Sequence, residues 1–276
     1  MAKMFMRYPG GVSKALTLSY DDGVKQDIRM IDILDKYGVK CTFNLNSGCF
    51  ASEGSSGRHL TLQGAVELYK NSNHEVAVHT RTHPWLETLP APQVALEVLE
   101  DRRELERLFG GVIRGMAYPY GTYSDDVVNV LKASGIAYSR TTKSTEDFTL
   151  PTDWLRLPAT CHHNNPRLME LAEKFVSRTY DKHPKLFYLW GHTYEFDDRD
   201  NWNVIEEFCQ AVANKDDIWY ATNIEIYDYV TAYNRLLWAI DMSAVHNPSA
   251  VSVWFALTKK GVLQTFEIKP GETVTL

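Results

Sequence analysis

Two kinds of segment alternate along most of the chain. Short runs rich in apolar, β-branched and aromatic residues are followed by longer stretches in which apolar residues recur every three or four positions. This alternation is typical of parallel strands joined by helical crossovers. The predicted strands are Leu16–Tyr20, Cys41–Leu45, Glu75–Val78, Gly115–Tyr118, Ile136–Thr141, Trp154–Leu157, Leu186–Trp190 and Ile218–Thr222.

Capping residues mark the helices between these strands. Thr61 and Ser124 stand directly before periodic apolar stretches and are predicted N-caps, as is Asp27 for the first helix. Gly38 is the expected stop of that helix, and Pro166 suits the first turn of a later one. The predicted helices cover residues 27–38, 61–69, 92–108, 125–133, 166–178, 202–213 and 224–235.

Seven or eight strand–helix units fit a closed or partly open barrel better than an open nucleotide-binding sheet. No GxGxxG or Walker A sequence follows any predicted strand, which removes the main support for nucleotide binding. After about Leu237 the pattern changes to β-segments at residues 250–257, 261–268 and 274–276. We therefore predict an α/β fold: a (β/α) barrel domain over residues 1–236, with a small C-terminal β-strand appendage over residues 237–276 packed on it.

The composition of the chain argues against nucleic-acid and membrane partners. The chain of 276 residues carries 35 acidic and 29 basic side chains, a formal charge of −6, which disfavours a general nucleic-acid binder. No apolar run approaches the roughly 18 residues of a membrane span, so no membrane partner is expected. The four cysteines are scattered without a CxxC pair, and residues 1–14 lack an apolar signal stretch. A cytoplasmic location is the expectation; the oligomeric state stays open.

Polar clusters follow several of the predicted strands. In barrels of this kind, active residues gather at the carboxyl ends of the strands. Asp21–Asp22, His79 with His83, and His192 all occupy such positions. Two imidazoles and one carboxylate can bind a divalent cation and leave a position open for water. A second carboxylate could then take a proton, and a further histidine could return one. The sequence therefore indicates metal-assisted hydrolysis.

Each cluster taken alone also has a structural interpretation. The acidic pair could cap the following helix, and an HxxxH pair could lie on the surface. If the segment 79–83 turns helically, both imidazoles point the same way. Adjacent residues do not easily share one ion, so Cys161–Asn164 is expected to form a loop near the cleft rather than a metal cluster. Trp85, two residues after His83, could stack on a sugar ring or pack in the core.

Four short motifs, in order, resemble those of the polysaccharide deacetylases, the NodB-like carbohydrate esterase family 4. Ser19-Tyr20-Asp21-Asp22-Gly23 resembles the TFDDG motif, and His79-Thr80-Arg81-Thr82-His83 resembles the HxxxH motif. Tyr118-Pro119-Tyr120-Gly121 is similar to the end of the RxPYG-type motif, and Leu189-Trp190-Gly191-His192 matches LxxH. These matches run from about residue 15 to 195, two thirds of the chain.

The resemblance implies a distorted barrel with fewer than eight full units, and it implies roles for particular residues. Asp21 would be the general base and His192 the general acid. The metal ligands would be Asp22, His79 and His83. The cofactor would be one divalent metal ion, with zinc expected and cobalt, nickel or iron open. Near the reacting carbonyl, the resemblance and the neighbourhood of His192 suggest Tyr120 (through its backbone N–H), Leu189 (lining the acyl pocket) and Trp190.

The sequence departs from the family pattern at two places. The third motif often opens with an arginine that pairs with the catalytic aspartate, but here that place is Ala117. Arg140, at the end of the next strand, is the candidate to supply this guanidinium and to tune the base. The fourth, DxxDW-like motif is poorly matched, with Asp153–Trp154 the nearest candidate.

The expected reaction is removal of N-acetyl groups from an amino-sugar oligosaccharide or polysaccharide. Hydrolysis of another linear or cyclic amide, such as a ureide or imide, is the alternative within the same chemistry. Two alternatives of other classes stay open. A non-catalytic carbohydrate-binding barrel gains weight from Ala117, and a non-haem Fe(II) oxygenase shares the ligand set of two histidines and one carboxylate.

Overall fold

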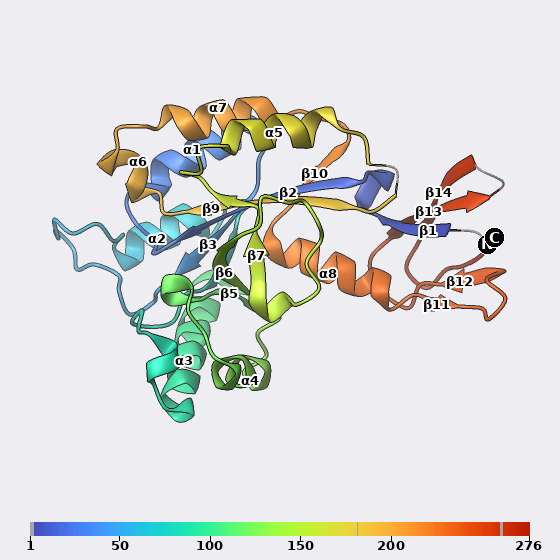
Figure 1. The fold of residues 1–276 in the computed structure, drawn as a ribbon. Helices are drawn as coiled ribbons and strands as arrows, with labels where there is room; N and C mark the ends of the chain where they lie inside the picture. The colour runs from blue at the N-terminus through green and yellow to red at the C-terminus, as the bar shows by residue number, and fades with distance from the viewer. Residues whose placement is uncertain (1–2, 181, 260–261) are drawn as a thin grey trace.

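The computed structural model describes residues 3–180, 182–259 and 262–276, and its centre is a wholly parallel sheet. In the described residues nine strands pair in this sheet, which agrees with the predicted strand–helix alternation (Figure 1). The strands are β2 (Lys14–Asp21), β3 (Cys41–Leu45), β4 (Glu75–Val78), β5 (Gly115–Ala117), β6 (Tyr138–Ser144), β7 (Leu157–Ala159), β8 (Cys161–His162), β9 (Lys185–Gly191) and β10 (Ile218–Tyr220).

The sheet curls into a distorted barrel. Its strand order is β7-β6-β5-β4-β3-β2-β9-β8, and β10 pairs with the start of β2. The two edges of the sheet are therefore consecutive pieces of chain. The Thr145 N–H donates to the Ala159 carbonyl at 3.0 Å on one side, and the Thr160 N–H donates to the Tyr188 carbonyl at 2.8 Å on the other. The segment from β7 to β8 thus bridges the edges, as the predicted barrel requires.

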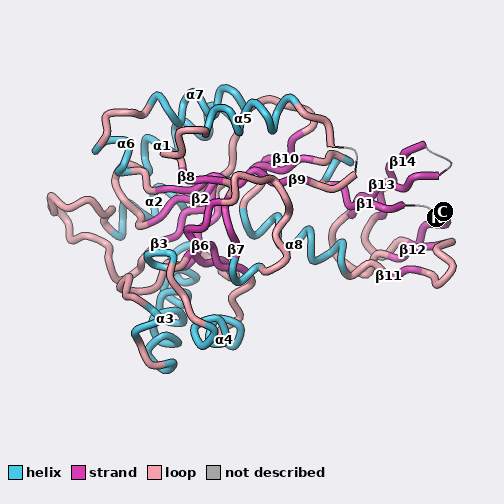
Figure 2. Tube along the Cα trace, in the orientation of Figure 1, coloured by secondary structure: helices cyan, strands magenta, loops and turns pink. Residues whose placement is uncertain are grey.

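Helices cover the outside of the barrel, with α1, α5 and α7 together on one side and α3 and α4 on another (Figures 1 and 2). Thr61 and Ser124 are N-caps as predicted, since their side chains accept from the Gly64 and Val127 N–H groups. Within the described residues, no helix combines the length and the apolarity needed to cross a bilayer. The helices are α1 (Asp27–Tyr37), α2 (Leu62–Tyr69), α3 (Ala91–Phe109), α4 (Asp125–Ala133), α5 (Leu168–Ser177), α6 (Tyr194–Asp198), α7 (Asn203–Val212) and α8 (Asn223–Asn234).

Three local predictions are wrong. Trp154–Arg156 is a 3₁₀ turn rather than a strand, because the Asp153 side chain accepts from the Leu155 N–H and curls the chain. Asp27 lies in the first turn of α1 rather than at its N-cap; its buried carboxylate accepts from the Val24 N–H at 3.1 Å. Pro166 precedes α5, whose N-cap is Arg167.

Strand β2 shows how the barrel positions the site. Leu16, Leu18 and Tyr20 lie in the main apolar core. The alternate residues are polar and pair with side chains of the neighbouring elements: Thr17 donates to Asn223 at 2.9 Å, and Ser19 accepts from Asn44 at 2.8 Å. Because side chains alternate along a strand, the next residue on this polar face is Asp21, at the carboxyl end of β2.

Two small antiparallel sheets follow the barrel at the C-terminal end of the chain. One consists of β1 (Lys3–Arg7), β13 (Val253–Lys259) and β14 (Val262–Ile268); the other of β11 (Leu237–Trp238), β12 (Ala244–His246) and β15 (Thr273–Thr275). The sequence analysis missed β1, which pairs with β13 and brings the two ends of the chain to the same side (Figure 1). Gly261, the predicted start of a strand, lies outside the described residues. The division at residue 236 stays a prediction.

Candidate active site

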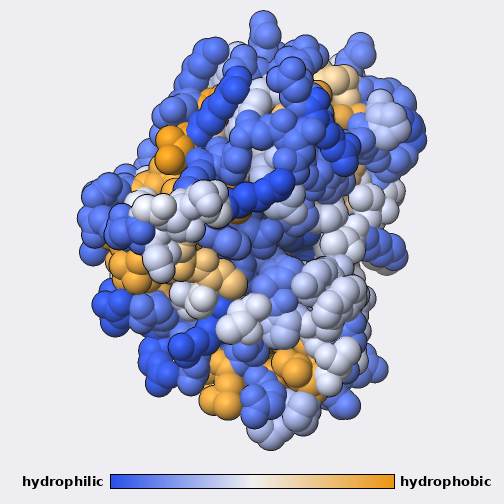
Figure 3. Space-filling view, turned by 90° about the vertical axis from the view of Figure 1, so that its left-hand side faces the viewer, coloured by the Kyte–Doolittle hydropathy of each residue, from blue (hydrophilic) through white to orange (hydrophobic). Residues whose placement is uncertain are grey.

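The predicted site residues meet at the carboxyl ends of the strands. Figure 3 looks onto this end of the barrel, which is mostly hydrophilic with a hollow near its middle and separate apolar patches around it. The end of β2 contributes Asp21 and Asp22, the segment after β4 contributes His79 and His83, and the segment after β9 contributes His192. The structure therefore brings together five side chains that the sequence separates by up to 171 positions.

Asp22, His79 and His83 form one tight group. The Asp22 Oδ1 atom lies 3.6 Å from His79 Nε2 and 3.7 Å from His83 Nε2. The three potential ligand atoms all lie within 4.8 Å of one another. Asp22 has a φ of 82°, a left-handed conformation that turns its side chain away from the path of β2. Its carbonyl accepts from His59 Nδ1 at 3.0 Å, a contact from the loop before α2 that holds this turn.

The histidine pair does not lie on a helix. The segment 79–83 is an irregular bend in which Thr80 and His83 have φ values of 66° and 59°. The Asn46 side-chain amide donates to the Thr80 carbonyl at 2.9 Å and fixes the bend. The segment 79–83 therefore does not meet the condition of a helical turn, although both imidazoles do face Asp22. Left-handed residues, rather than helical periodicity, align the two rings.

The three side chains suit a divalent cation. His79 Nδ1 lies 2.8 Å from the Ala117 carbonyl oxygen, which can only accept, so Nδ1 carries the proton and Nε2 presents its lone pair. The separations between Asp22 and the two Nε2 atoms are too long for hydrogen bonds and match ligands that share an ion between them. Two nitrogens and one oxygen also leave positions open for water and substrate, as catalytic zinc sites do.

Asp101 supports this group and was missed by the sequence analysis. Its buried carboxylate accepts from the His79 N–H at 3.1 Å and from the Ser47 N–H at 2.7 Å. Burial raises the pKa of Asp101 to about 7, although these bonds oppose the rise. A signal was present: Val94, Val98 and Leu105 of α3 are buried, and Asp101 occupies the same stripe. A carboxyl group on an apolar stripe indicates a specific partner.

Asp21 pairs with a buried arginine, and its Oδ2 atom also lies 3.9 Å from His79 Nε2. The Arg140 guanidinium bonds to Asp21 Oδ2, and the Asn44 amide donates to Oδ1 at 2.8 Å. Ala117 and Arg140 are register partners on β5 and β6, so Arg140 reaches the base from the strand next to the predicted motif position. Burial by itself would raise the pKa of Asp21, but Arg140 and the neighbouring imidazoles outweigh it and lower that pKa.

His192 lies near the same Asp21 oxygen as Arg140 and His79. Its Nε2 is 3.8 Å from Asp21 Oδ2, while its Nδ1 is 2.8 Å from Glu195 Oε1. Burial opposes the charged form of His192, but the bond to Glu195 and the charges of Asp21 and Asp22 raise its pKa. Glu195 follows His192 by three residues in the sequence, and this bond orients the imidazole ring. Asp153, the nearest match to the fourth motif, instead pairs with Arg156 at 2.8 Å.

Glu195 also contacts His162 and His163, which are adjacent in the sequence. Their Nε2 atoms lie 3.3 and 3.5 Å from its carboxylate oxygens, so adjacent histidines do face one group, contrary to the sequence expectation. His162 Nδ1 accepts from the Asn164 N–H at 3.1 Å, which places the proton of the neutral ring on Nε2. The His162 imidazole therefore offers Glu195 a hydrogen rather than a lone pair. Its Nε2 lone pair is not available to a cation, in contrast to that of His79 in the Asp22 group. Burial would raise the pKa of Glu195, but its bonds to His162, His163 and His192 lower it.

The remaining predicted residues lie around this centre. Tyr120 has a φ of 57°, and its ring lies 4.5 Å from that of His83. Trp190 is largely buried, and the Arg140 guanidinium lies over its ring at 4.3 Å. Leu189 is fully buried in β9 between Leu18 and Cys161, so its contact with an acyl group stays a prediction.

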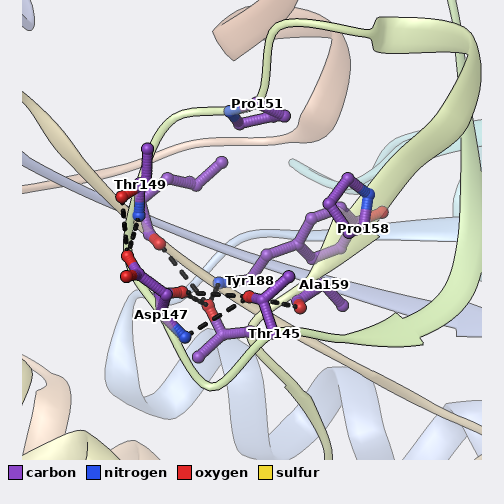
Figure 4. A pocket seen from close by; sticks show the side chains of 9 residues that line it. Thr145, Asp147, Thr149, Pro151, Pro158, Ala159 and Tyr188 are labelled. Carbon is purple, nitrogen blue, oxygen red and sulfur yellow. Dashed lines mark hydrogen bonds between the residues drawn. The ribbon is translucent and has the colours of Figure 1, made fainter.

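A small pocket lies elsewhere, between β9 and the loop after β6 (Figure 4). It has a volume of about 70 Å³ and none of the predicted site residues lines it. Asp147 beside it accepts from the Thr149 N–H and hydroxyl at 2.6 and 2.7 Å, a local turn that occupies its carboxylate. This pocket has room for little more than water.

The fold and this centre together define a class: an α/β barrel with a cluster of two histidines and one carboxylate, flanked by a buried acid–arginine pair and an oriented histidine. A family model described as polysaccharide deacetylase matches residues 9–139. This stretch contains Asp21, Asp22, His79, His83 and Tyr120. Over this stretch, a little under half of its length, the chain is similar to the polysaccharide deacetylase family.

Curated relatives are similar over about half of this chain. A chitooligosaccharide deacetylase of Sinorhizobium fredii is 28% identical over 145 residues, which cover 51% of this chain and 63% of the relative. One from Rhizobium leguminosarum is 30% identical over 142 residues, covering 51% and 56%. The matched region spans less than two thirds of the length of these relatives.

Solved structures show the same fold. A putative polysaccharide deacetylase from Mycobacterium smegmatis has a TM-score of 0.58 at 15% identity and covers 82% of this chain and 93% of its own. A family 4 carbohydrate esterase from Streptomyces lividans, in complex with acetate, has a TM-score of 0.51 at 16% identity, covering 73% and 88%. At these identities the likeness concerns the barrel alone.

Proposed function

We propose that this protein is a metal-dependent deacetylase that removes N-acetyl groups from an amino-sugar oligosaccharide or polysaccharide. The observation that carries the proposal is the position of Asp21 and His192. A carboxylate and an imidazole lie 3.8 Å apart, directly beside a group of three side chains suited to a cation. One is poised to accept a proton and the other to donate one, as amide hydrolysis requires. The curated relatives carry the name chitooligosaccharide deacetylase.

Asp22, His79 and His83 would hold the cation, which we propose to be zinc because imidazole and carboxylate ligands in a three-protein-ligand set are typical of catalytic zinc. When bound, such a cation polarises an amide carbonyl and makes a nearby water more acidic. The Ala117 carbonyl and Asp101 support this role by fixing the ring and backbone of His79.

The chain's own residues then divide the proton transfers. Asp21 is kept ionised by Arg140, so it can accept a proton from the attacking water as the new C–O bond forms. The Tyr120 backbone N–H is our candidate donor to the oxygen of the carbonyl as it gains charge. His192 gives its Nε2 proton to the amide nitrogen as the C–N bond breaks, which releases acetate and a free amine. The hydroxyl of the water thus becomes part of the acetate. Asp21 then releases its proton to solvent, and His192 takes one up from solvent, which restores both side chains for the next turnover.

The substrate class is tested by direct assay. The purified protein is incubated with Zn²⁺ or Co²⁺ and either N-acetylglucosamine oligomers or cyclic ureides and imides. We expect acetate release from the oligomers and no ring opening of the ureides. Ring opening without acetate release would move the proposal to the alternative amide class.

Two other classes receive less support from the geometry. A non-catalytic carbohydrate-binding barrel rested on Ala117, but Arg140 supplies a guanidinium to Asp21 from the neighbouring strand. Sugar binding without turnover in any metal would favour that class. The usual fold of a non-haem Fe(II) oxygenase is a jelly-roll, whereas the strands here form a parallel barrel with helices around it. Oxygen consumption with Fe(II) would revive it.

Glu195→Gln is expected to lower kcat/KM about tenfold at neutral pH and to move the alkaline limb of the pH profile to lower pH. Glu195 helps to raise the pKa of His192, so removing its charge lowers that pKa. The acid form of His192 is then lost at a lower pH. The pH dependence of kcat/KM measures this shift, with Glu173→Gln, at an exposed position of α5, as the charge-matched control. An unmoved alkaline limb would mean that Glu195 does not act through His192.

A further inference from the structure

Two aromatic rings stand exposed beside the proposed metal ligands. Trp85 and Tyr120 are each 48% exposed, and their rings lie parallel, 7° apart in plane, with centroids 4.0 Å apart. The Tyr120 ring also meets the His83 ring edge-on, at 4.5 Å between centroids and 73°. The stacked pair therefore begins at a proposed metal ligand and continues outward from the site. We call Trp85 with Tyr120 the aromatic pair.

The backbone under the aromatic pair is held in place. Tyr120 adopts a φ of 57°, which is uncommon for an aromatic residue and is maintained only where the surroundings require it. Gly121 follows with a φ of 73°, and a Cβ there would lie 2.2 Å from the Thr142 side chain. The Thr122 hydroxyl donates to Glu87 at 2.7 Å and joins the Tyr120 loop to the turn after Trp85. The two rings are thus presented by a fixed support.

Packing alone does not account for this arrangement. A tryptophan in the core would be buried, whereas about half of Trp85 remains in contact with water, at a cost to stability. Large exposed rings beside a reactive centre are typical of ligand contacts. An indole offers a flat apolar surface that suits the C–H face of a pyranose ring, and the polar Glu87–Thr122 pair lies next to it.

We propose that the aromatic pair is a carbohydrate subsite: it stacks a pyranose ring adjacent in the chain to the residue being deacetylated. The subsite makes the protein selective for oligomers over single N-acetylated sugars. This inference rests on the proposed function and specifies its substrate as a chain that extends beyond the metal centre. Trp85 is the determining residue, because its ring forms the outer end of the stack.

The test compares Trp85→Ala and Trp85→Phe with the wild type on the N-acetylglucosamine pentamer and on the single sugar. Trp85→Ala is expected to raise KM for the pentamer about tenfold with kcat within twofold, and to leave kcat/KM for the single sugar unchanged. Trp85→Phe, which keeps a flat ring, should recover most of the loss. Leu237→Ala, at a 60% exposed apolar position in the C-terminal sheets, is the control and should match the wild type. Equal loss on both substrates, or no loss on the pentamer, overturns the subsite.

Binding without turnover separates this inference from the proposed function. In an Asp21→Asn background, calorimetry with Zn²⁺ and the pentamer gives a Kd that does not depend on catalysis. Adding Trp85→Ala should weaken this Kd about tenfold. If the wild type releases no acetate but the pentamer binds through Trp85, the function fails and the subsite stands. If acetate is released and Trp85→Ala leaves the Kd unchanged, the subsite fails and the function stands.

Discussion

Asp22→Ala is expected to abolish both metal binding and hydrolysis. Asp22 contributes the only carboxylate of the three-residue group, and its Oδ1 lies 3.6 and 3.7 Å from the two Nε2 atoms. Two imidazoles alone would hold zinc at least about 100-fold more weakly. Without the cation, deacetylation should fall by about 1000-fold or more, because activation of water and stabilisation of the carbonyl oxygen are lost together. Zinc content after dialysis and the rate of acetate release measure the two effects.

Asp21→Asn provides the matched comparison. Asp21 is not one of the three potential ligands. The Asp21→Asn variant should therefore retain zinc while losing most of the deacetylation rate. Asp32→Ala, an exposed aspartate of α1, should change neither quantity. If Asp22→Ala binds zinc like the wild type, the cation site lies elsewhere. If Asp21→Asn loses zinc, the division of roles between the adjacent aspartates is wrong.

Sequence patterns predicted the fold well where structure depends on local signals. β3, β4 and α4 have the predicted bounds, because each combines a clear apolar pattern with turn or cap residues. The prediction failed at 154–156, where the Asp153 side chain caps a 3₁₀ turn, whereas Leu157 does begin strand β7. β8 was missed because it has only two residues, and β1 because its pairing partner, β13, is distant in the sequence.

The site could be predicted only as far as its motifs reach. Asp21, Asp22 and His192 follow strands whose parallel arrangement brings their ends together, so their convergence follows from topology. The supporting contacts are different in origin. Asp101 comes from a helix, and Glu195 comes from a five-residue helix that begins after His192. No spacing rule links such groups to the motifs, and their roles depend on the angles at which the helices pack against the barrel.

Arg140 could be predicted only in part: the sequence suggests it as a candidate, but its role depends on the register of two strands. The sequence lacks an arginine at Ala117 and offers one at the end of the next strand. Whether the two positions are equivalent depends on register, and the structure pairs Ala117 with Arg140 across β5 and β6. The guanidinium is almost fully buried between Asp21 and the Trp190 ring. A charge in this position needs its partner, since an unpaired ion in a protein interior is strongly unfavourable.

Arg140→Ala is therefore expected to lower the rate at neutral pH by about 100-fold and to move the acid limb of the pH profile to higher pH. With the guanidinium present, the pKa of Asp21 is lowered and the base is ionised in mildly acidic solution. Without it, burial dominates and raises that pKa, so ionisation requires a higher pH. The unpaired carboxylate should also reduce the free energy of unfolding by about 3–5 kcal/mol at neutral pH. The pH dependence of kcat/KM and chemical denaturation measure these changes.

Arg140→Lys separates the electrostatic role from a purely structural one. Lysine keeps the positive charge but not the planar, multiple donors, so it should restore much of the acid limb while recovering only part of the rate. A structural role alone predicts lower stability with an unchanged pH profile in both variants. If Arg140→Ala leaves rate and profile unaltered, Arg140 does not substitute for the arginine missing at Ala117, and the ionisation of Asp21 must depend on its other neighbours, His79 and His192.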